Sequence, residues 1–185
     1  LLSLYASLAN GFFQEFISNA EFATFIQQVE EPNLLQNLRL AEQQQEWGNA
    51  QSILQALGKV YDKWGCKLEF KALRQRALNQ IGIHLVEAKA KGKNAFDFWV
   101  YLRNNEVNEA WNRTDLEAAK AIHQEILDEL IDLNDSNDFS VNDINDIIAV
   151  CYHQLGNIAF RQWQFEQAQQ YYLKALKIRE DAGDF

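Results

Sequence analysis

The sequence contains no methionine, a single proline and eight glycines in 185 residues. Because proline and glycine interrupt helices most strongly, their scarcity leaves long uninterrupted stretches, which favour helices and disfavour a sheet-rich fold with many turns. Hydrophobic residues make up 48% of the chain and charged residues 23%, so a real core can form and intrinsic disorder is not expected. We therefore expect an all-α protein. Since the chain has no methionine and begins at Leu1 inside an amphipathic segment, we also expect it to be a fragment of a longer protein.

Cysteines and basic runs are also scarce. The two cysteines, Cys66 and Cys151, form no CxxC motif, so a disulfide-stapled secreted domain is not expected and a cytoplasmic location fits better. The formal charge is −9, and the densest basic cluster is the broken set Lys89, Lys91 and Lys93. Nucleic acid and anionic membrane are poor partners for such a surface. No apolar run approaches the ~20 residues that a membrane span needs.

Apolar residues recur at i, i+3, i+4 and i+7 along most of the chain, which is the period of amphipathic helices. Breaks are indicated at Glu31-Pro32-Asn33, at Gly48, at Gly65 and at Gly92. The loops between the segments are short, so consecutive helices are expected to lie antiparallel. The predicted helices cover 3–17, 20–29, 34–46, 48–63, 67–90, 94–112, 115–133, 141–162 and 164–181.

Small residues follow a regular spacing near the C-terminus. Leu155-Gly156 is followed by Ala159, and then by Phe165, Ala168, Tyr172 and Ala175-Leu176. Small side chains on facing helices let the two helices cross closely, while aromatic side chains fill the flanking space. This segment resembles a tetratricopeptide (TPR) repeat, and the resemblance implies a right-handed superhelix of antiparallel helical hairpins.

The Ala-x8-Ala spacing of Ala159 and Ala168 occurs three times. It recurs 118 positions earlier at Ala41 and Ala50, and 49 positions earlier at Ala110 and Ala119. One hairpin cannot bury its own apolar surface, so neighbouring hairpins are expected to stack on it. We therefore expect an N-terminal helical segment over 1–31 and degenerate TPR-like repeats over 32–185, the most regular being 149–183.

A fainter fourth copy is predicted from Ile81-Gly82 through Leu85 to Phe98 and Leu102. It requires the helix over 94–112 to break near Asn104-Asn105, which would give the later helices an alternating inner and outer order.

In TPR proteins the inner helices line a concave groove, and the resemblance implies such a groove here. Its candidate residues lie at matching positions of two copies. An asparagine amide both donates and accepts hydrogen bonds, so it can bracket a peptide unit of an extended ligand, and Arg161 can pair with a carboxylate. The alternative is a solvated helix face that happens to be rich in asparagine. The candidates are Asn104, Asn108, Trp111, Asn112, His153, Asn157, Phe160 and Arg161.

The stretch EEPNLLQNLRLAEQQQEWGNAQSILQALGKVYDKWG, followed by a long helix and degenerate repeats, resembles the helical region of bacterial STAND proteins. These signal-transduction ATPases join an ATPase core to a TPR array. The chain contains no GxxxxGK[ST], so no nucleotide site is carried over. We expect a non-catalytic protein- or peptide-binding module that is the scaffold or sensor segment of a larger regulatory protein. The alternative is an intramolecular arm that controls an upstream STAND-type ATPase.

Residues 132–143 place oxygen-bearing side chains at alternate positions, as a calcium-binding EF-hand loop does. Asn137 stands where such a loop needs glycine, and Asp143 stands where a glutamate normally closes it. A flexible acidic loop that caps the following helix is therefore favoured over a calcium site.

No catalytic or metal site is expected elsewhere. His84, His123 and His153 are far apart in sequence, so a zinc site has no support. Cys151 and His153 are two residues apart, which points them to different faces of a helix and favours Cys151 as a small buried residue. We expect no enzyme activity and no cofactor.

Among the five tryptophans, Trp111 is the candidate aromatic anchor for a ligand. The other four are expected mainly in the core. Trp163 occupies a position where TPR units usually carry glycine, and it either wedges the turn or is exposed. Unguarded repeat ends leave self-association open as a further interaction.

Overall fold

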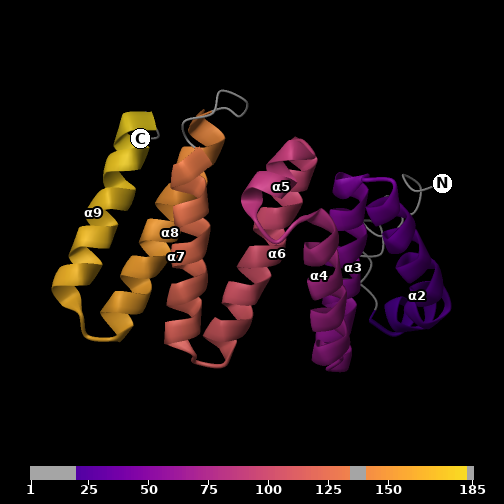
Figure 1. Cartoon of the computed structure of the whole chain (residues 1–185). Coiled ribbons are helices and arrows are strands. Elements are labelled where there is room, and N and C mark those ends of the chain that lie inside the picture. The colour runs from indigo at the N-terminus through magenta and orange to yellow at the C-terminus, as the bar shows by residue number, and fades with distance from the viewer. Residues whose placement is uncertain (1–19, 134–140, 183–185) are drawn as a thin grey trace. The chain divides into compact units, whose positions relative to one another are not determined.

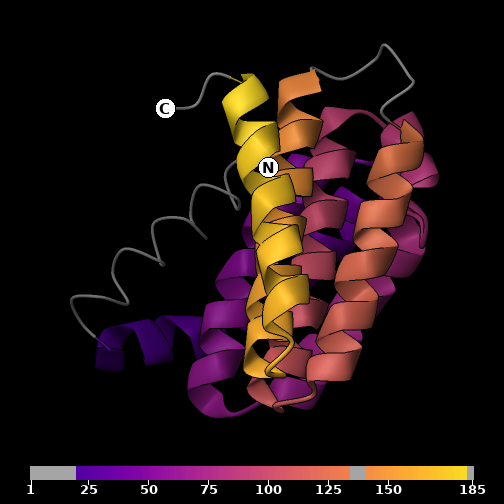
Figure 2. The same ribbon diagram turned by 90° about the vertical axis from the view of Figure 1, so that its left-hand side faces the viewer.

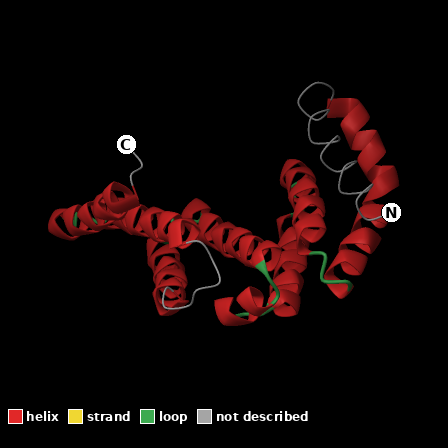
Figure 3. Ribbon diagram, turned by 90° about the horizontal axis from the view of Figure 1, so that it is seen from above, coloured by secondary structure: helices red, strands yellow, loops and turns green. Residues whose placement is uncertain are grey.

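The computed structural model describes residues 20–133 and 141–182, and every regular element within them is an α-helix (Figures 1 and 3). The predicted helix over 3–17 and most of the predicted acidic loop over 132–143 lie outside the described residues. The helices are α2 (Ala20–Gln43), α3 (Trp47–Trp64), α4 (Lys67–Ile81), α5 (Leu85–Ala90), α6 (Lys93–Asn112), α7 (Leu116–Leu133), α8 (Val141–Arg161) and α9 (Phe165–Ala182).

The fold class predicted from the sequence is confirmed: the described residues form a TPR-like helical repeat fold in which adjacent helices pack as pairs. α8 and α9 are joined by a three-residue turn, lie side by side and make the most extensive contact between two helices (Figures 1 and 2). The observed ends of α3, α6, α7, α8 and α9 lie within one residue of the predicted ends.

Pro32 does not interrupt the helix, although the sequence predicts a helix break at this position. α2 is a single helix of 24 residues with Pro32 inside it, so the two predicted helices over 20–29 and 34–46 are one. Proline removes one backbone donor, but nearby side chains add bonds within this part of the helix. Asn33 Nδ2 donates to Glu30 Oε2 over 2.9 Å, and Asn37 Nδ2 donates to the carbonyl oxygen of Asn33 over 2.8 Å.

The prediction of one helix over 67–90 is also wrong. α4 ends at Ile81 because Gly82 adopts φ 122°, a conformation that favours glycine, and the short helix α5 follows. In contrast, α6 continues through Asn104 and Asn105 without a break. The fourth repeat copy, which requires a break there, is therefore not present in the predicted form.

Three turns share one geometry, at the positions where the Ala-x8-Ala spacing recurs. The left-handed residues are Gln45, Thr114 and Trp163, with φ values of 58°, 60° and 62°. Trp163 follows Gln45 by 118 positions and Thr114 by 49 positions, as the predicted repeat register requires. In each turn the next amide donates to the carbonyl five residues back, over 2.8–2.9 Å. These are the bonds of a Schellman motif, which satisfies the last carbonyls of a helix. Each turn is followed by a helix of 18 residues, namely α3, α7 and α9.

The chain divides into two compact units, and the first comprises the described parts of Leu1–Ile83 and Glu87–Leu102. Its core includes Trp99, Phe96, Phe98 and Leu38, which are 1% exposed or less. Arg76 on α4 donates to both carboxylate oxygens of Glu42 on α2, each bond measuring 3.2 Å. Burial raises the pKa of the Glu42 carboxyl, although Arg76 opposes that rise.

The second unit comprises His84–Val86 and the described part of Arg103–Phe185, and it contains all the candidate groove residues. Its core is formed by apolar side chains of α7 and α8, among them Ile126, Leu130, Leu155 and Ile158, each 2% exposed or less. Ala110, Ala119, Ala159 and Ala168 are also buried, as the repeat spacing predicts. In the hairpin of α8 and α9, the small side chains of Ala159 and Ala168 allow the two helices to pack closely.

Candidate functional site

The hairpin of α8 and α9 is built around Gly156. A Cβ atom added at Gly156 would meet the ring of Tyr172 at 2.5 Å, so the aromatic ring occupies the space that a side chain would need. The Tyr172 hydroxyl then donates to Asn157 Oδ1 over 2.8 Å. Gly156 and Tyr172 therefore form the close crossing that the repeat pattern predicts.

Four candidate groove residues lie on α8, and they differ in their freedom to contact a ligand. His153, Phe160 and Arg161 are exposed, whereas Asn157 is half-buried. Asn157 Nδ2 donates to Gln154 Oε1 over 3.2 Å, while its oxygen accepts the bond from Tyr172. The amide of Asn157 thus joins α8 to α9, which leaves it less capacity for a ligand than its predicted position in the groove implies.

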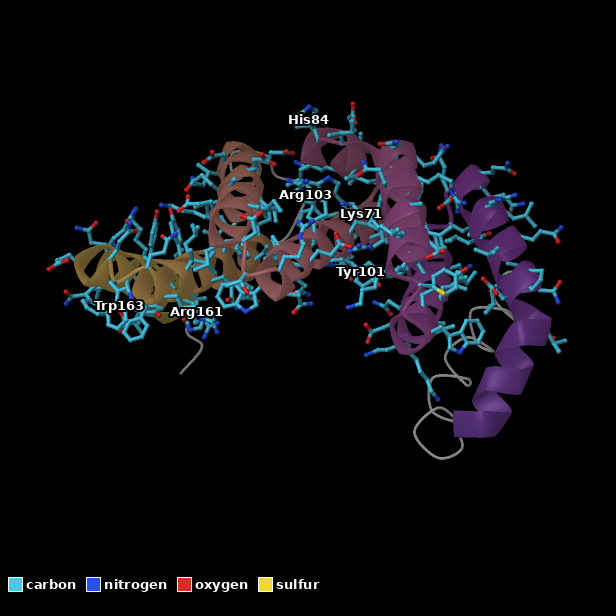
Figure 4. All side chains as sticks on the ribbon, turned by 90° about the horizontal axis from the view of Figure 1, so that it is seen from below. Lys71, His84, Tyr101, Arg103, Arg161 and Trp163 are labelled. Atoms are coloured by element: carbon cyan, nitrogen blue, oxygen red, sulfur yellow. The ribbon has the colours of Figure 1, made fainter. Side chains whose placement is uncertain are left out.

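The other four candidates lie on α6. Asn104, Asn108 and Asn112 are exposed at intervals of four residues, and Trp111 is half-buried. The Arg161 guanidinium lies 4.4 Å from the centroid of the Trp111 ring, in cation–π geometry. The structure therefore brings Trp111 and Arg161 together, and this contact joins the two sets of candidates at the end of α8 (Arg161 is labelled in Figure 4).

Trp163 and Phe165 are exposed aromatic residues that are not among the groove residues predicted from the sequence. The Trp163 side chain is 81% exposed, so the core position favoured for it is wrong and the alternative of exposure holds (Figure 4). Phe165, expected to fill space beside the helix crossing, is 47% exposed. The sequence signal that could have found this feature is the tryptophan itself, at a turn position where repeats of this kind usually carry glycine.

The other tryptophans agree with the expected core positions to different degrees. Trp47 and Trp99 are buried, and Trp99 Nε1 donates to the carbonyl oxygen of Ile83 over 3.1 Å. Trp64 is half-buried.

Two titratable groups are buried among the described residues of the second unit. Cys151 is 2% exposed, and burial raises the pKa of its thiol to about 12, which keeps the sulfur protonated and unreactive at neutral pH. Cys151 is thus the small buried residue that the sequence predicts, while His153 lies on the exposed side of the same helix. Burial also lowers the pKa of His123 on α7 to about 4, so this imidazole is neutral at pH 7.

Within 20–133 and 141–182, no group of three or more histidine, cysteine, aspartate or glutamate residues is placed to hold a metal ion. No helix among these described residues combines the length and apolarity that crossing a membrane requires.

Comparison with known proteins gives one informative result. No curated protein and no solved structure matches the chain. Residues 148–182 match the tetratricopeptide repeat family, and this range contains most of α8 and all of α9. The family is typically non-catalytic and its repeats generally bind proteins, which supports a protein-binding module. The match does not extend to the resemblance to STAND ATPases, which stays a prediction.

Proposed function

We propose that this chain recognises an extended peptide segment of another protein through the exposed faces of α6 and α8. The observation that carries the proposal is the repeat match over 148–182, together with exposed polar side chains on the helices that line the groove in such repeats. In the parent protein the module acts as a scaffold or sensor segment in a regulatory, cytoplasmic setting.

The spacing of the α6 asparagines suits such a ligand. Asn104, Asn108 and Asn112 are four residues apart, and a helix rises 1.5 Å per residue, so their Cα atoms repeat every ~6 Å along the helix. An extended peptide repeats every two residues, which is ~6.6 Å. Successive asparagine amides can therefore meet every second residue of a strand that runs along the helix, each amide donating to the carbonyl oxygen and accepting from the N–H group of the same residue.

The end of this face supplies a different kind of contact. Trp111 and Arg161 are already stacked, so their geometry is fixed before a ligand arrives and little side-chain entropy is lost on binding. The guanidinium N–H groups of Arg161 can bond a carbonyl or carboxylate of the ligand.

The proposal is tested with random 12-residue peptides displayed on phage and selected on the purified chain. Fluorescence anisotropy then gives the affinity of each selected peptide for the wild type and for the triple variant Asn104→Ala, Asn108→Ala, Asn112→Ala. We expect the triple variant to bind at least about tenfold more weakly, because three amide contacts are lost.

The matched control is Gln169→Ala with Gln170→Ala, which removes two exposed amides from α9. This control should bind like the wild type, and far-UV circular dichroism should show that both variants keep their helices. Equal affinity of the wild type and the asparagine variant, or a selection that yields no binding peptide, would contradict the proposal.

A further inference from the structure

Three aromatic side chains form an exposed cluster at the turn between α8 and α9. Phe160, Trp163 and Phe165, hereafter the turn cluster, are 56%, 81% and 47% exposed. The ring centroids of Phe160 and Phe165 are 5.5 Å apart, and those of Trp163 and Phe165 are 5.9 Å apart, both in edge-to-face geometry. Aromatic side chains of this kind supply most of the binding energy at many protein interfaces.

The fold does not require a tryptophan at position 163. Trp163 has φ 62°, a left-handed conformation that is unfavourable for a bulky residue. The equivalent turns carry Gln45 and Thr114 and form the same backbone hydrogen bonds, so the turn forms without an aromatic residue. The side chain is also outside the core. A strained and exposed aromatic residue that neither the turn nor the core requires points to a contact outside the chain.

The net negative charge of the chain comes from residues 103–185, the half of the sequence that carries this cluster. Residues 103–185 contain seven lysines and arginines against sixteen aspartates and glutamates, a net charge of −9, whereas residues 1–102 contain ten of each. Two carboxylates lie at the turn itself. Glu166 is exposed beside Phe165, and Glu117 accepts a hydrogen bond of 2.6 Å from Gln162, the residue before Trp163.

Arg161 also adjoins the turn cluster, but its guanidinium lies over Trp111. The same part of the molecule thus already holds one arginine on a tryptophan face. The aromatic faces of the turn cluster, with the carboxylates of Glu117 and Glu166 at the same turn, offer this mode of binding to a second cation.

We infer that the turn cluster binds a basic segment of the partner protein, with an arginine or lysine side chain placed over Trp163 and the carboxylates of Glu117 and Glu166 beside it. A second copy of this chain is disfavoured as the occupant, because each copy carries a net charge of −9 and two copies repel each other. This inference rests on the proposed function, since it names the chemistry of the protein segment that the module recognises.

The test uses two blocked peptides as probes. One is an octapeptide of alternating arginine and alanine, and the other has citrulline at each arginine, which removes the charge and keeps nearly the same shape. The whole chain is labelled with 5-fluorotryptophan, and ¹⁹F NMR follows the five tryptophan signals during titration, with the Trp163 signal assigned by its absence in Trp163→Phe.

We expect the arginine peptide to shift the Trp163 signal and to bind at least about fivefold more tightly than the citrulline peptide. Affinity of the arginine peptide for unlabelled protein, measured by calorimetry, should fall at least about fivefold in Trp163→Ala. The control is Leu68→Ala, which removes a side chain that is 79% exposed on α4 and should leave the affinity unchanged.

Four results would overturn the inference: no binding of the arginine peptide to the wild type at millimolar concentration, equal binding of the citrulline peptide, equal affinity in Trp163→Ala, or a concentration-dependent dimer that Trp163→Ala abolishes. Its failure is distinguishable from failure of the proposed function. If the phage-selected peptides depend on the α6 asparagines but no probe depends on Trp163, the proposed function stands and this inference falls. If the selected peptides do not depend on the asparagines, the proposed function fails independently of the arginine probe.

Discussion

The buried imidazole of His123 predicts that the protein loses stability as the pH falls below about 6.5. His123 is 3% exposed, its Nδ1 atom has no hydrogen-bond partner among the described residues, and burial lowers its pKa from the usual 6.5 to about 4. Between these two values the unfolded chain binds a proton that the folded chain does not. Stability is therefore greatest above pH 6.5 and declines as the pH falls through this window.

The size of the loss follows from the two pKa values. Each unit of difference corresponds to 1.36 kcal/mol, so lowering the pH from 7 to 5 should remove about 2 kcal/mol of the free energy of unfolding, and the full loss near pH 4 should approach about 3 kcal/mol. For a domain of this size, 2 kcal/mol is a large part of the total stability.

The measurement is urea unfolding followed by far-UV circular dichroism at pH 7 and pH 5, for the wild type and for His123→Leu. Other groups also titrate over this range, so the readout is the change in the difference between wild type and variant. That difference should shift by about 2 kcal/mol in favour of the variant at pH 5. His123→Gln serves as a second variant if the leucine variant folds poorly, and His153→Gln removes an exposed imidazole as a control. A wild type and a His123 variant that lose stability in parallel would refute the reasoning.

Three other changes are expected to alter the free energy of urea unfolding at pH 7. Trp163→Gly should raise it by about 1 kcal/mol, because glycine adopts the left-handed conformation of the turn without strain; a loss of stability would show that the exposed ring contributes to the fold. Gly156→Ala should lower it by about 1–3 kcal/mol despite the better helix propensity of alanine, because the new Cβ atom overlaps the Tyr172 ring, and an unchanged value would contradict this close crossing. Arg76→Ala should lower it by about 2 kcal/mol by leaving Glu42 buried without its partner, and adding Glu42→Met should recover most of that loss, whereas no recovery would mean that Arg76 acts through other contacts.

The repeat spacing predicted the parts of the fold that depend on small residues at fixed intervals. Ala110 and Ala119 are buried at positions equivalent to Ala159 and Ala168, and the turn between each pair has the same hydrogen bonds. A fixed number of residues between two small contact positions determines the length of the turn and therefore the start of the next helix. This information is local, so the sequence contains it.

The features that the sequence did not predict depend on neighbours in space. Pro32 lies within α2, where side-chain bonds accompany the lost backbone bond and tertiary contacts outweigh propensity. The core position favoured for Trp163 was wrong because hydrophobicity alone does not say whether other residues cover a side chain. For Asn157, the helix position was predicted correctly, but the bond from Tyr172 that occupies its amide was not.

The repeated turn separates what the fold requires from what it permits. The three left-handed residues, Gln45, Thr114 and Trp163, have no common side-chain chemistry, yet they adopt the same conformation. In each turn the backbone amide of the next residue donates to the carbonyl oxygen of a buried alanine. The conformation is therefore determined by the helix-terminating bonds, and the side chain at the left-handed position is free to vary. At such a position the backbone conformation is fixed, but the fold does not need the side chain. A side chain there is therefore held in a defined place and is available for binding. In the hairpin that matches the tetratricopeptide repeat family, this position carries an exposed tryptophan, for which we infer a basic partner segment.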